Sequence, residues 1–414
     1  MVTTNDTTHE NFYVYTDDIH GEWSDPITVA QDGIDPSLYF EDGHVYFISN
    51  GSDDYGDHGV VQCEINIETG EKLSHSKCIW HGSGGRYLES PHMYKIGEFY
   101  YLMAAEGGTE YGHMITYCRS DSVWGPFDNY PHNPVLTNRN KAPEIIQGIG
   151  HGDLIQDRNG NWFILSLGFR QIHMWQPYHH LGREVFLTPV SFGEDGWFTA
   201  GKDGTTDAEY EIQGNFVQQE KKLYTFENTD WSIDWCWLRH PCEENYRLSE
   251  NSAVLRGTNI TLDDADSPTF IGIRQRDFDM ELSVEASVNS ESSGEGGVTV
   301  YMCENEHYDI AVRKNDESSD EWEAVLRLNI GGIKHVQNTL RLDSGKARLL
   351  IRSDSTTYNF AVSENGRETV LGSGQSKYLS SEVAGGFTGV VLGLYAVGSD
   401  TSAEFTGLEI KYSE

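Results

Sequence analysis

The chain has 414 residues, of which 65 are Asp or Glu and 29 are Lys or Arg, so its formal net charge is −36 at pH 7. This excess of acid argues against a nucleic-acid partner, because nucleic-acid binding needs a basic face. The length predicts two domains, and 43 Gly with 12% aromatic residues, broken by frequent turn residues, predict an all-β protein of short strands.

The first residues, MVTTNDTTHENFYVYTDD, have neither the basic nor the apolar region of a signal peptide. No apolar run reaches the length of a membrane span. The six cysteines show no CxxC spacing, which argues against a zinc site and favours buried thiols. We therefore expect a cytoplasmic protein with no membrane partner. Its acidity also predicts a halophilic source, in which salt screens the repulsion between carboxylates.

Three segments share one pattern, in which a polar residue precedes an apolar strand, a Gly-containing turn and an aromatic-rich strand. They read GIDPSLYFEDGHVYFIS, YLESPHMYKIGEFYYLMAAEG and GIGHGDLIQDRNGNWFILSLG, with Asp35, Glu89 and His151 as the polar residues. Their spacings, 54 (89 − 35) and 62 (151 − 89), are typical of β-propeller blades. Inner strands of a propeller line one channel, so the three side chains are predicted to share a pocket. The alternative is that Asp35 and Glu89 only cap turns.

The stretch FYVYTDDIHGEWSDP at 12–26 resembles MITYCRSDSVWGPFDN at 114–129, an outer hairpin that follows the strands after Glu89. We therefore expect the chain to begin in the middle of a blade, without the two inner strands of that blade. An incomplete propeller exposes an unpaired edge, which predicts a homo-oligomer or a complementing N-terminal fragment as partner.

The predicted domains are a partial propeller at 1–222, which ends in the polar linker TTDAEYEIQGNFVQQEKK, and a β-sandwich at 223–414. The second part contains segments in which apolar and polar residues alternate, separated by turns such as Glu364-Asn365-Gly366. Among these segments are GGVTVYMCEN, HYDIAVRKN, EAVLRLNI and TYNFAVSEN.

The segments GIDPSLYFEDG, ESPHMYKIGEFYYLMAAEGGTEYGH, GHGDLIQ and HHLGREVFLTPV together resemble glycoside hydrolase family 43. The resemblance covers nearly the whole chain and is greatest to two-domain β-xylosidases and α-L-arabinofuranosidases. It implies a five-bladed propeller, here incomplete, followed by a concanavalin-like β-sandwich. It also implies inverting hydrolysis of xylo- or arabino-oligosaccharides, with no required cofactor.

By motif match, the resemblance makes Glu89 the general acid and Asp35 the carboxylate that orients this acid and raises its pKa. Asp35 in DPS could also match the family's general base, but Gly33-Ile34 before it and the short spacing to Glu89 favour the modulator. No other segment matches the base motif, so we expect weak hydrolysis by this chain alone. The alternative is a sugar-binding pseudoenzyme.

Four further residues match substrate-binding positions of the family: Arg183, His151, Thr109 and Phe387. Each has a structural alternative: an ion-pair arginine, a hydrogen-bonded histidine, a turn threonine and a core phenylalanine. The resemblance also leaves open a calcium ion beside His151. Candidates for stacking on a sugar are Trp80, Trp175 and Tyr178.

Overall fold

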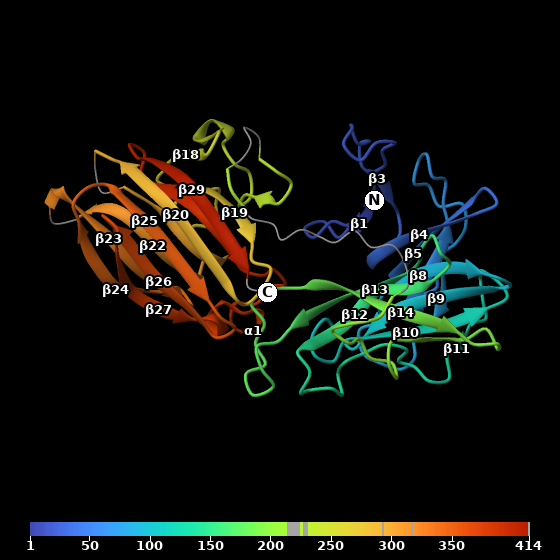
Figure 1. Ribbon diagram of the computed structural model, residues 1–414. Coiled ribbons are helices and arrows are strands. Elements are labelled where there is room, and N and C mark those ends of the chain that lie inside the picture. Colours follow the sequence, from blue (N-terminus) through green and yellow to red (C-terminus); the bar gives the residue numbers. More distant parts are fainter. Residues whose placement is uncertain (213–223, 227–230, 292–293, 316–317, 413–414) are drawn as a thin grey trace. The chain divides into compact units, whose positions relative to one another are not determined.

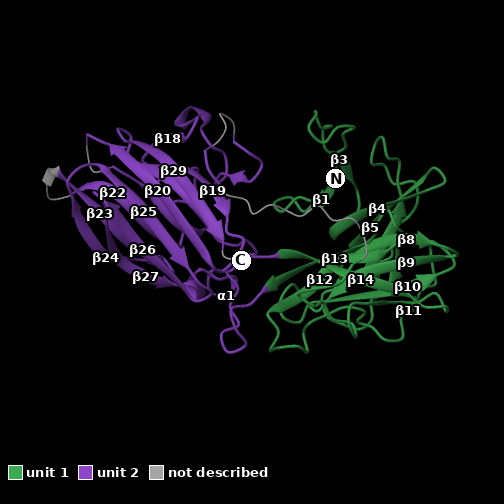
Figure 2. Ribbon diagram, viewed as in Figure 1, with its two compact units in different colours: residues 1–169, 184–215 green, residues 170–183, 216–414 purple. Residues whose placement is uncertain are grey.

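The computed structural model describes residues 1–212, 224–226, 231–291, 294–315 and 318–412. They form two compact units, one of Met1–Phe169 with Glu184–Asn215 and the other of Arg170–Arg183 with Phe216–Glu414 (Figure 2). The regular secondary structure of both is almost entirely strand, as predicted (Figure 1). No helix among the described residues is long and apolar enough to cross a membrane.

The first unit consists of four antiparallel sheets whose strands follow one another in chain order, which is the arrangement of propeller blades. The first sheet contains β1 (Val2–Thr4), β2 (Asn11–Tyr13) and β3 (Ile27–Val29). The second contains β4 (Ile34–Glu41), β5 (His44–Ser52), β6 (His58–Glu64) and β7 (Lys77–Trp80). The third contains β8 (Glu89–Ile96), β9 (Phe99–Glu106), β10 (Met114–Ser120) and β11 (Asp128–Asn129). The fourth contains β12 (Ile146–Gln156), β13 (Trp162–Arg170), β14 (Glu184–Phe192) and β15 (Phe198–Ala200).

Apolar side chains between consecutive sheets hold this unit together. Each pair of neighbouring sheets shares one buried cluster, and representative members are Tyr13 with Phe47, Ile48 with Leu102, and Tyr117 with Phe198. The rings of Tyr117 and Phe198 stack with their centroids 3.9 Å apart. Aromatic residues in the strands therefore form the contacts between blades, which explains their high frequency in the sequence.

The first sheet differs from the prediction by one strand. The stretch at 12–26 was expected to be the first paired element, with no strand before it. Instead β1 pairs with β2 through Val2–Tyr13 and Thr4–Asn11, so this sheet has three strands. The short segment VTT has no hydrophobic alternation by which it could be recognised.

The second unit is the predicted β-sandwich of two seven-stranded sheets. One has the order β16-β19-β28-β21-β22-β23-β24 and the other the order β17-β18-β29-β20-β25-β26-β27. The first sheet consists of β16 (Trp235–Cys236), β19 (Thr269–Arg274), β28 (Val391–Val397), β21 (Glu295–Cys303), β22 (Glu306–Asn315), β23 (Ser318–Ile330) and β24 (Ile333–Leu342). The second consists of β17 (Tyr246–Ser249), β18 (Ser252–Arg256), β29 (Ser402–Tyr412), β20 (Met280–Asn289), β25 (Lys346–Ser353), β26 (Thr357–Glu364) and β27 (Arg367–Gln375).

A single large apolar cluster lies between the two sheets, with Val300, Ile310 and Phe360 fully buried in it. The predicted turn at 364–366 joins β26 to β27, and Asn365 and Gly366 both have positive φ, as a tight hairpin requires. Three very short helices lie among the described residues of this unit: η1 (Glu243–Asn245), η2 (Ser376–Leu379) and α1 (Ser381–Ala384).

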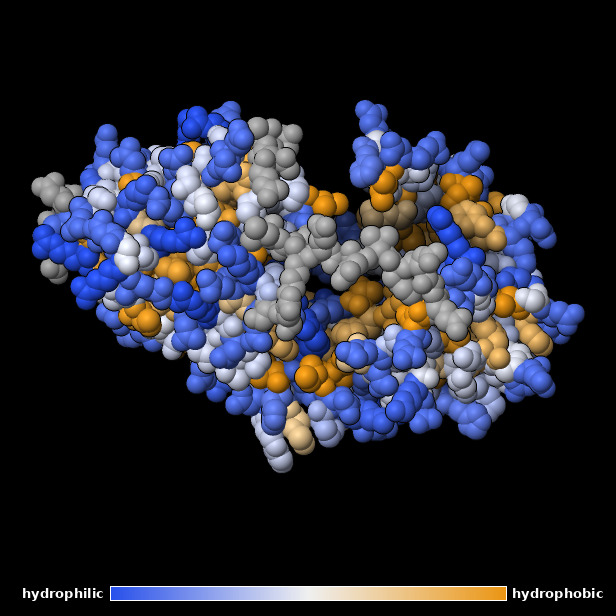
Figure 3. Space-filling view, in the orientation of Figure 1, coloured by the Kyte–Doolittle hydropathy of each residue, from blue (hydrophilic) through white to orange (hydrophobic). Residues whose placement is uncertain are grey.

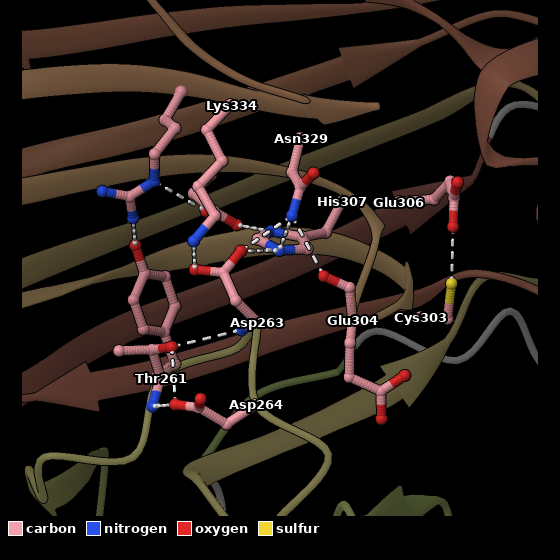
Figure 4. Close-up of polar contacts among 12 residues, drawn as sticks. Thr261, Asp263, Asp264, Cys303, Glu304, Glu306, His307, Asn329 and Lys334 are labelled. Atoms are coloured by element: carbon pink, nitrogen blue, oxygen red, sulfur yellow. Dashed lines mark hydrogen bonds and ion pairs between the residues drawn. The ribbon is translucent and has the colours of Figure 1, made fainter. Parts of the chain in front are cut away.

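The outer face of the first sandwich sheet carries a buried polar network (Figure 4). His307 lies between Asp309, at 2.8 Å from its Nδ1, and Asp263, at 3.2 Å from its Nε2. Lys334 and Asn329 also contact Asp263, at 2.7 Å each. The network fastens the loop that carries Asp263 to strands β22, β23 and β24.

The surface seen in Figure 3 is mainly hydrophilic, in keeping with the high charge of the chain. The predicted boundary between residues 222 and 223 falls in 213–223, outside the described residues. By its contacts, the segment 170–183 belongs to the sandwich unit, although it lies between strands β13 and β14 in sequence.

Candidate active site

The first unit contains Asp35, Glu89, His151 and Thr109. The first three lie on the innermost strands β4, β8 and β12, and all are half-buried. Thr109 lies in the turn between β9 and β10 and is also half-buried. The repeat pattern therefore placed the three polar residues on equivalent strands, as predicted.

The backbone has an unusual conformation at each of these strand starts. Asp35 has φ of 50° and His151 has φ of 43°, while Ser90, directly after Glu89, has φ of 57°. The pairing register also shifts between Ile34 and Ser37 and between Glu89 and His92, which marks bulges. Left-handed backbone at a non-glycine residue costs about 1–3 kcal/mol and clusters at functional sites. The bulges re-aim the side chains at these positions.

A hydrogen bond fixes the register between the two carboxylate-bearing strands. The hydroxyl of Ser37 donates to the carbonyl of Pro91 at 2.6 Å. Ser37 lies two positions after Asp35, and Pro91 lies two positions after Glu89. Residues that are 54 positions apart in the sequence are therefore aligned with each other on β4 and β8. Asp35 and Glu89 thus occupy equivalent places on neighbouring strands.

A histidine beside Asp35, His92, was not predicted from the sequence. Burial lowers the pKa of His92, and the nearby carboxylates of Asp153 and Asp35 oppose this effect. The Nδ1 atom of His92 lies 3.8 Å from Asp153, which also accepts a hydrogen bond from the Tyr94 hydroxyl. His92 and Asp153 stand in the motifs ESPHM and GHGDL, so their nearness to Glu89 and His151 in the repeat was the signal that could have found them.

The connection that leads to Glu89 is anchored by the fully buried Glu106. Its carboxylate accepts hydrogen bonds from the backbone N–H of Ser83 at 2.6 Å, from that of Gly85, and from the hydroxyl of Thr116 at 2.8 Å. A buried carboxylate is stable only with such donors. Glu106 therefore sets the path of the chain just before the candidate acid.

The sandwich unit contains the other two predicted residues, Arg183 and Phe387. The guanidinium of Arg183 lies over the Phe387 ring, 3.9 Å from its centroid. Phe387 is 58% exposed, so it is not the core phenylalanine that the sequence left as an alternative. Two residues 204 positions apart (387 − 183) thus form one cation–π pair.

A hydrogen-bonded clasp links the two segments that carry this pair. The carboxylate of Glu382 accepts the backbone N–H of His179 at 2.9 Å and contacts its Nδ1 at 2.6 Å. The backbone N–H of Val390 donates to the carbonyl of His180 at 2.9 Å. Burial would raise the pKa of Glu382, but the hydrogen bonds and charge of His179 hold it below its usual value.

The aromatic residues that were candidates for stacking on a sugar differ in their exposure to solvent. Trp80 is 5% exposed and donates a hydrogen bond to Asn129 at 2.7 Å, so it is a packing residue. Trp175 is 79% exposed and Tyr178 is half-buried, both on the 170–183 segment.

Similarity to known proteins extends over both units. Residues 1–198 match the family model for glycosyl hydrolases family 43, and residues 224–411 match that of the beta xylosidase C-terminal concanavalin A-like domain. The chain is 36% identical over 396 residues to a non-reducing end alpha-L-arabinofuranosidase of Bacteroides ovatus. The aligned region covers 94% of this chain and 73% of the relative. The chain belongs to glycosyl hydrolase family 43.

Other relatives and solved structures agree with the family 43 assignment. A xylosidase/arabinosidase of Butyrivibrio fibrisolvens is 29% identical, over 96% of this chain and 80% of that protein. The structure of Bacteroides ovatus Xyloglucan PUL GH43B has a TM-score of 0.89 at 33% identity and covers 100% of this chain and 83% of its own. The xylan beta-1,4-xylosidase structure from Bacillus halodurans has a TM-score of 0.87 at 27% identity, over 97% and 81% of the two chains.

Proposed function

We propose that this family 43 protein removes xylose or arabinofuranose units from xylo- or arabino-oligosaccharides, with Glu89 as the general acid and Asp35 as the carboxylate that orients it. The observation that carries the proposal is the shared register of Asp35 and Glu89, held by the bond between Ser37 and Pro91. The family membership and the names of the relatives supply the substrate class.

In this mechanism Glu89 protonates the oxygen of the leaving sugar. A second carboxylate nearby keeps the proton on such an acid at working pH, because two like charges in one pocket disfavour each other. Inversion also needs a general base about 6.5–9.5 Å away that activates a water molecule. Apart from the DPS of Asp35, which we assign to the modulator, no segment of this sequence matches the family's base motif. We therefore propose that turnover by this chain alone is reduced by roughly 10²–10⁴-fold, the usual contribution of one acid–base group.

The missing base motif also favours a second candidate, a pseudoenzyme that binds pentose sugars without cleaving them. Arg183 and Phe387 would then serve binding alone.

The test is hydrolysis of aryl β-xylosides and aryl α-L-arabinofuranosides in buffer of high salt concentration. Replacing Glu89 by Gln should reduce turnover strongly for a nitrophenyl leaving group and much less for a dinitrophenyl one, which leaves without a proton. Glu98→Gln, an exposed glutamate in the turn after β8, is the matched control and should change neither rate. Equal losses for both leaving groups would refute the acid role of Glu89. Xylose binding without any turnover would establish the pseudoenzyme.

A further inference from the structure

Three side chains with metal-binding atoms meet at the edge of the second sheet, outside the candidate active site. Asp57 directly precedes β6, Cys78 lies on β7, and His81 directly follows β7. One ligand atom from each lies within 4.8 Å of the other two. Asp57 and His81 are exposed and Cys78 is half-buried, so an ion can reach the group from solvent.

The hydrogen bonding of His81 determines which of its nitrogens is available. The Nδ1 atom lies 3.1 Å from the carbonyl oxygen of His58, which can only accept, so Nδ1 carries a proton and donates it. The Nε2 atom then faces the Asp57 carboxylate oxygen at 3.4 Å. Metal-binding histidines typically donate their other ring N–H to a backbone carbonyl in this way. The Nε2 atom can thus either carry a proton that it shares with the Asp57 carboxylate or bind a metal ion in place of that proton.

The spacing of the ligand atoms suits a small divalent ion. Nitrogen and oxygen ligands bound to Zn²⁺ at tetrahedral angles lie about 3.4 Å apart, which is the separation between His81 and Asp57. The Cys78 sulfur lies 3.7 Å from Nδ1 of the same ring and within 4.8 Å of a carboxylate oxygen of Asp57. Gly59 leaves space here, since a Cβ atom at this position would lie 2.9 Å from the Cys78 sulfur.

We propose that Asp57, Cys78 and His81 bind a divalent cation of the zinc class, with water in a fourth position. Thiolate, imidazole and carboxylate together select zinc over calcium or magnesium, which prefer oxygen ligands. As the sulfur–metal bond forms, the Cys78 thiol releases its proton to solvent. The ion links the turn before β6 to the start of residues 81–88, the connection that leads to Glu89. The CxxC criterion could not detect this site, because its third ligand lies 21 residues (78 − 57) before the cysteine.

The test is calorimetric titration of the metal-stripped full chain with Zn²⁺, followed by titration with Co²⁺ and measurement of thiolate-to-cobalt absorption. We expect one site, and we expect Cys78→Ser, Asp57→Asn and His81→Gln each to weaken Zn²⁺ binding more than tenfold. Cys78→Ser should also abolish the thiolate band. The control variants Cys242→Ser, at an exposed cysteine, and His75→Gln, at an exposed histidine, should bind as the unchanged chain does.

A wild-type chain that takes up no zinc would overturn the proposal, as would cluster variants that bind zinc as tightly as the wild type. If Cys78→Ser does not fold, as judged by circular dichroism, the zinc affinities of Asp57→Asn and His81→Gln decide the question. None of these readouts depends on hydrolysis, so the outcome is independent of the proposed function.

Discussion

We expect the stability of the sandwich to depend on pH through His307. Burial alone would lower the pKa of this 1%-exposed histidine, but the carboxylates of Asp309 and Asp263 outweigh burial and raise its pKa to about 9. The guanidinium of Arg327 also faces this carboxylate, 3.2 Å from the second oxygen of Asp309. The ordinary value, 6.5, applies to the unfolded chain. The His307 ring therefore binds a proton more tightly in the folded protein than in the unfolded chain.

The sign and size of the effect follow from this difference. Because the folded pKa lies above the unfolded one, the stabilisation is fully present below pH 6.5 and is lost as the pH rises through 9. At 1.36 kcal/mol per pKa unit, the full contribution is about 3 kcal/mol. Between roughly pH 6 and pH 8.5 the free energy of unfolding should fall by about 2 kcal/mol from this group alone.

Urea unfolding of the full chain at constant high salt concentration, followed by tryptophan fluorescence over this pH range, measures the effect. His307→Gln should remove most of this pH dependence, because glutamine does not titrate. His335→Gln, at an exposed histidine of β24, should leave it unchanged. A wild-type stability that is flat between pH 6 and pH 8.5, or an equal slope in His307→Gln, would refute the reasoning.

Three further predictions follow. Replacing Glu382 by Gln removes the charge that contacts His179, so sugar binding measured by titration should weaken roughly tenfold. The control Glu368→Gln, at an exposed glutamate, should leave the sugar affinity unchanged. Unchanged affinity in Glu382→Gln would show that the clasp does not position Arg183. Burial lowers the pKa of His180 to about 3, helped by the charges of His179 and Arg170 and opposed by Glu382, so stability should fall as the pH drops below 6.5. His180→Phe should resist acid better in a urea titration at pH 5, and a loss of acid resistance would contradict this. Because the net charge is −36, the melting temperature should rise between about 0.1 and 1 M KCl, and a melting temperature that falls with salt would contradict the screening argument.

Local sequence patterns were sufficient to predict several strands of both units and the equivalence of the first strands of the blades. Alternation of apolar residues predicted β21, β22 and β26, and the Asn365-Gly366 pair predicted the hairpin that follows β26. The repeat predicted that Asp35 and Glu89 lie on equivalent inner strands, because blades of one propeller repeat the same pairing register.

Contacts between residues distant in the chain could not be predicted in this way. Glu382 and His179 are 203 residues apart, and no periodicity links them. The ion pairs around His307 join three strands and a loop, and each residue alone reads as an ordinary polar residue of a strand. The strand β1 was missed because three residues carry too little pattern to reveal a strand.

The central claim is that Glu89 and Asp35 act on one glycosidic bond. The most direct measurement is a crystal structure of the Glu89→Gln chain with a bound xylo- or arabino-oligosaccharide. We expect the side chain of residue 89 within about 2.6–3.2 Å of the glycosidic oxygen, with Asp35 beside it. A sugar bound elsewhere, or an oligosaccharide whose glycosidic oxygen faces a different carboxyl group, would contradict the account.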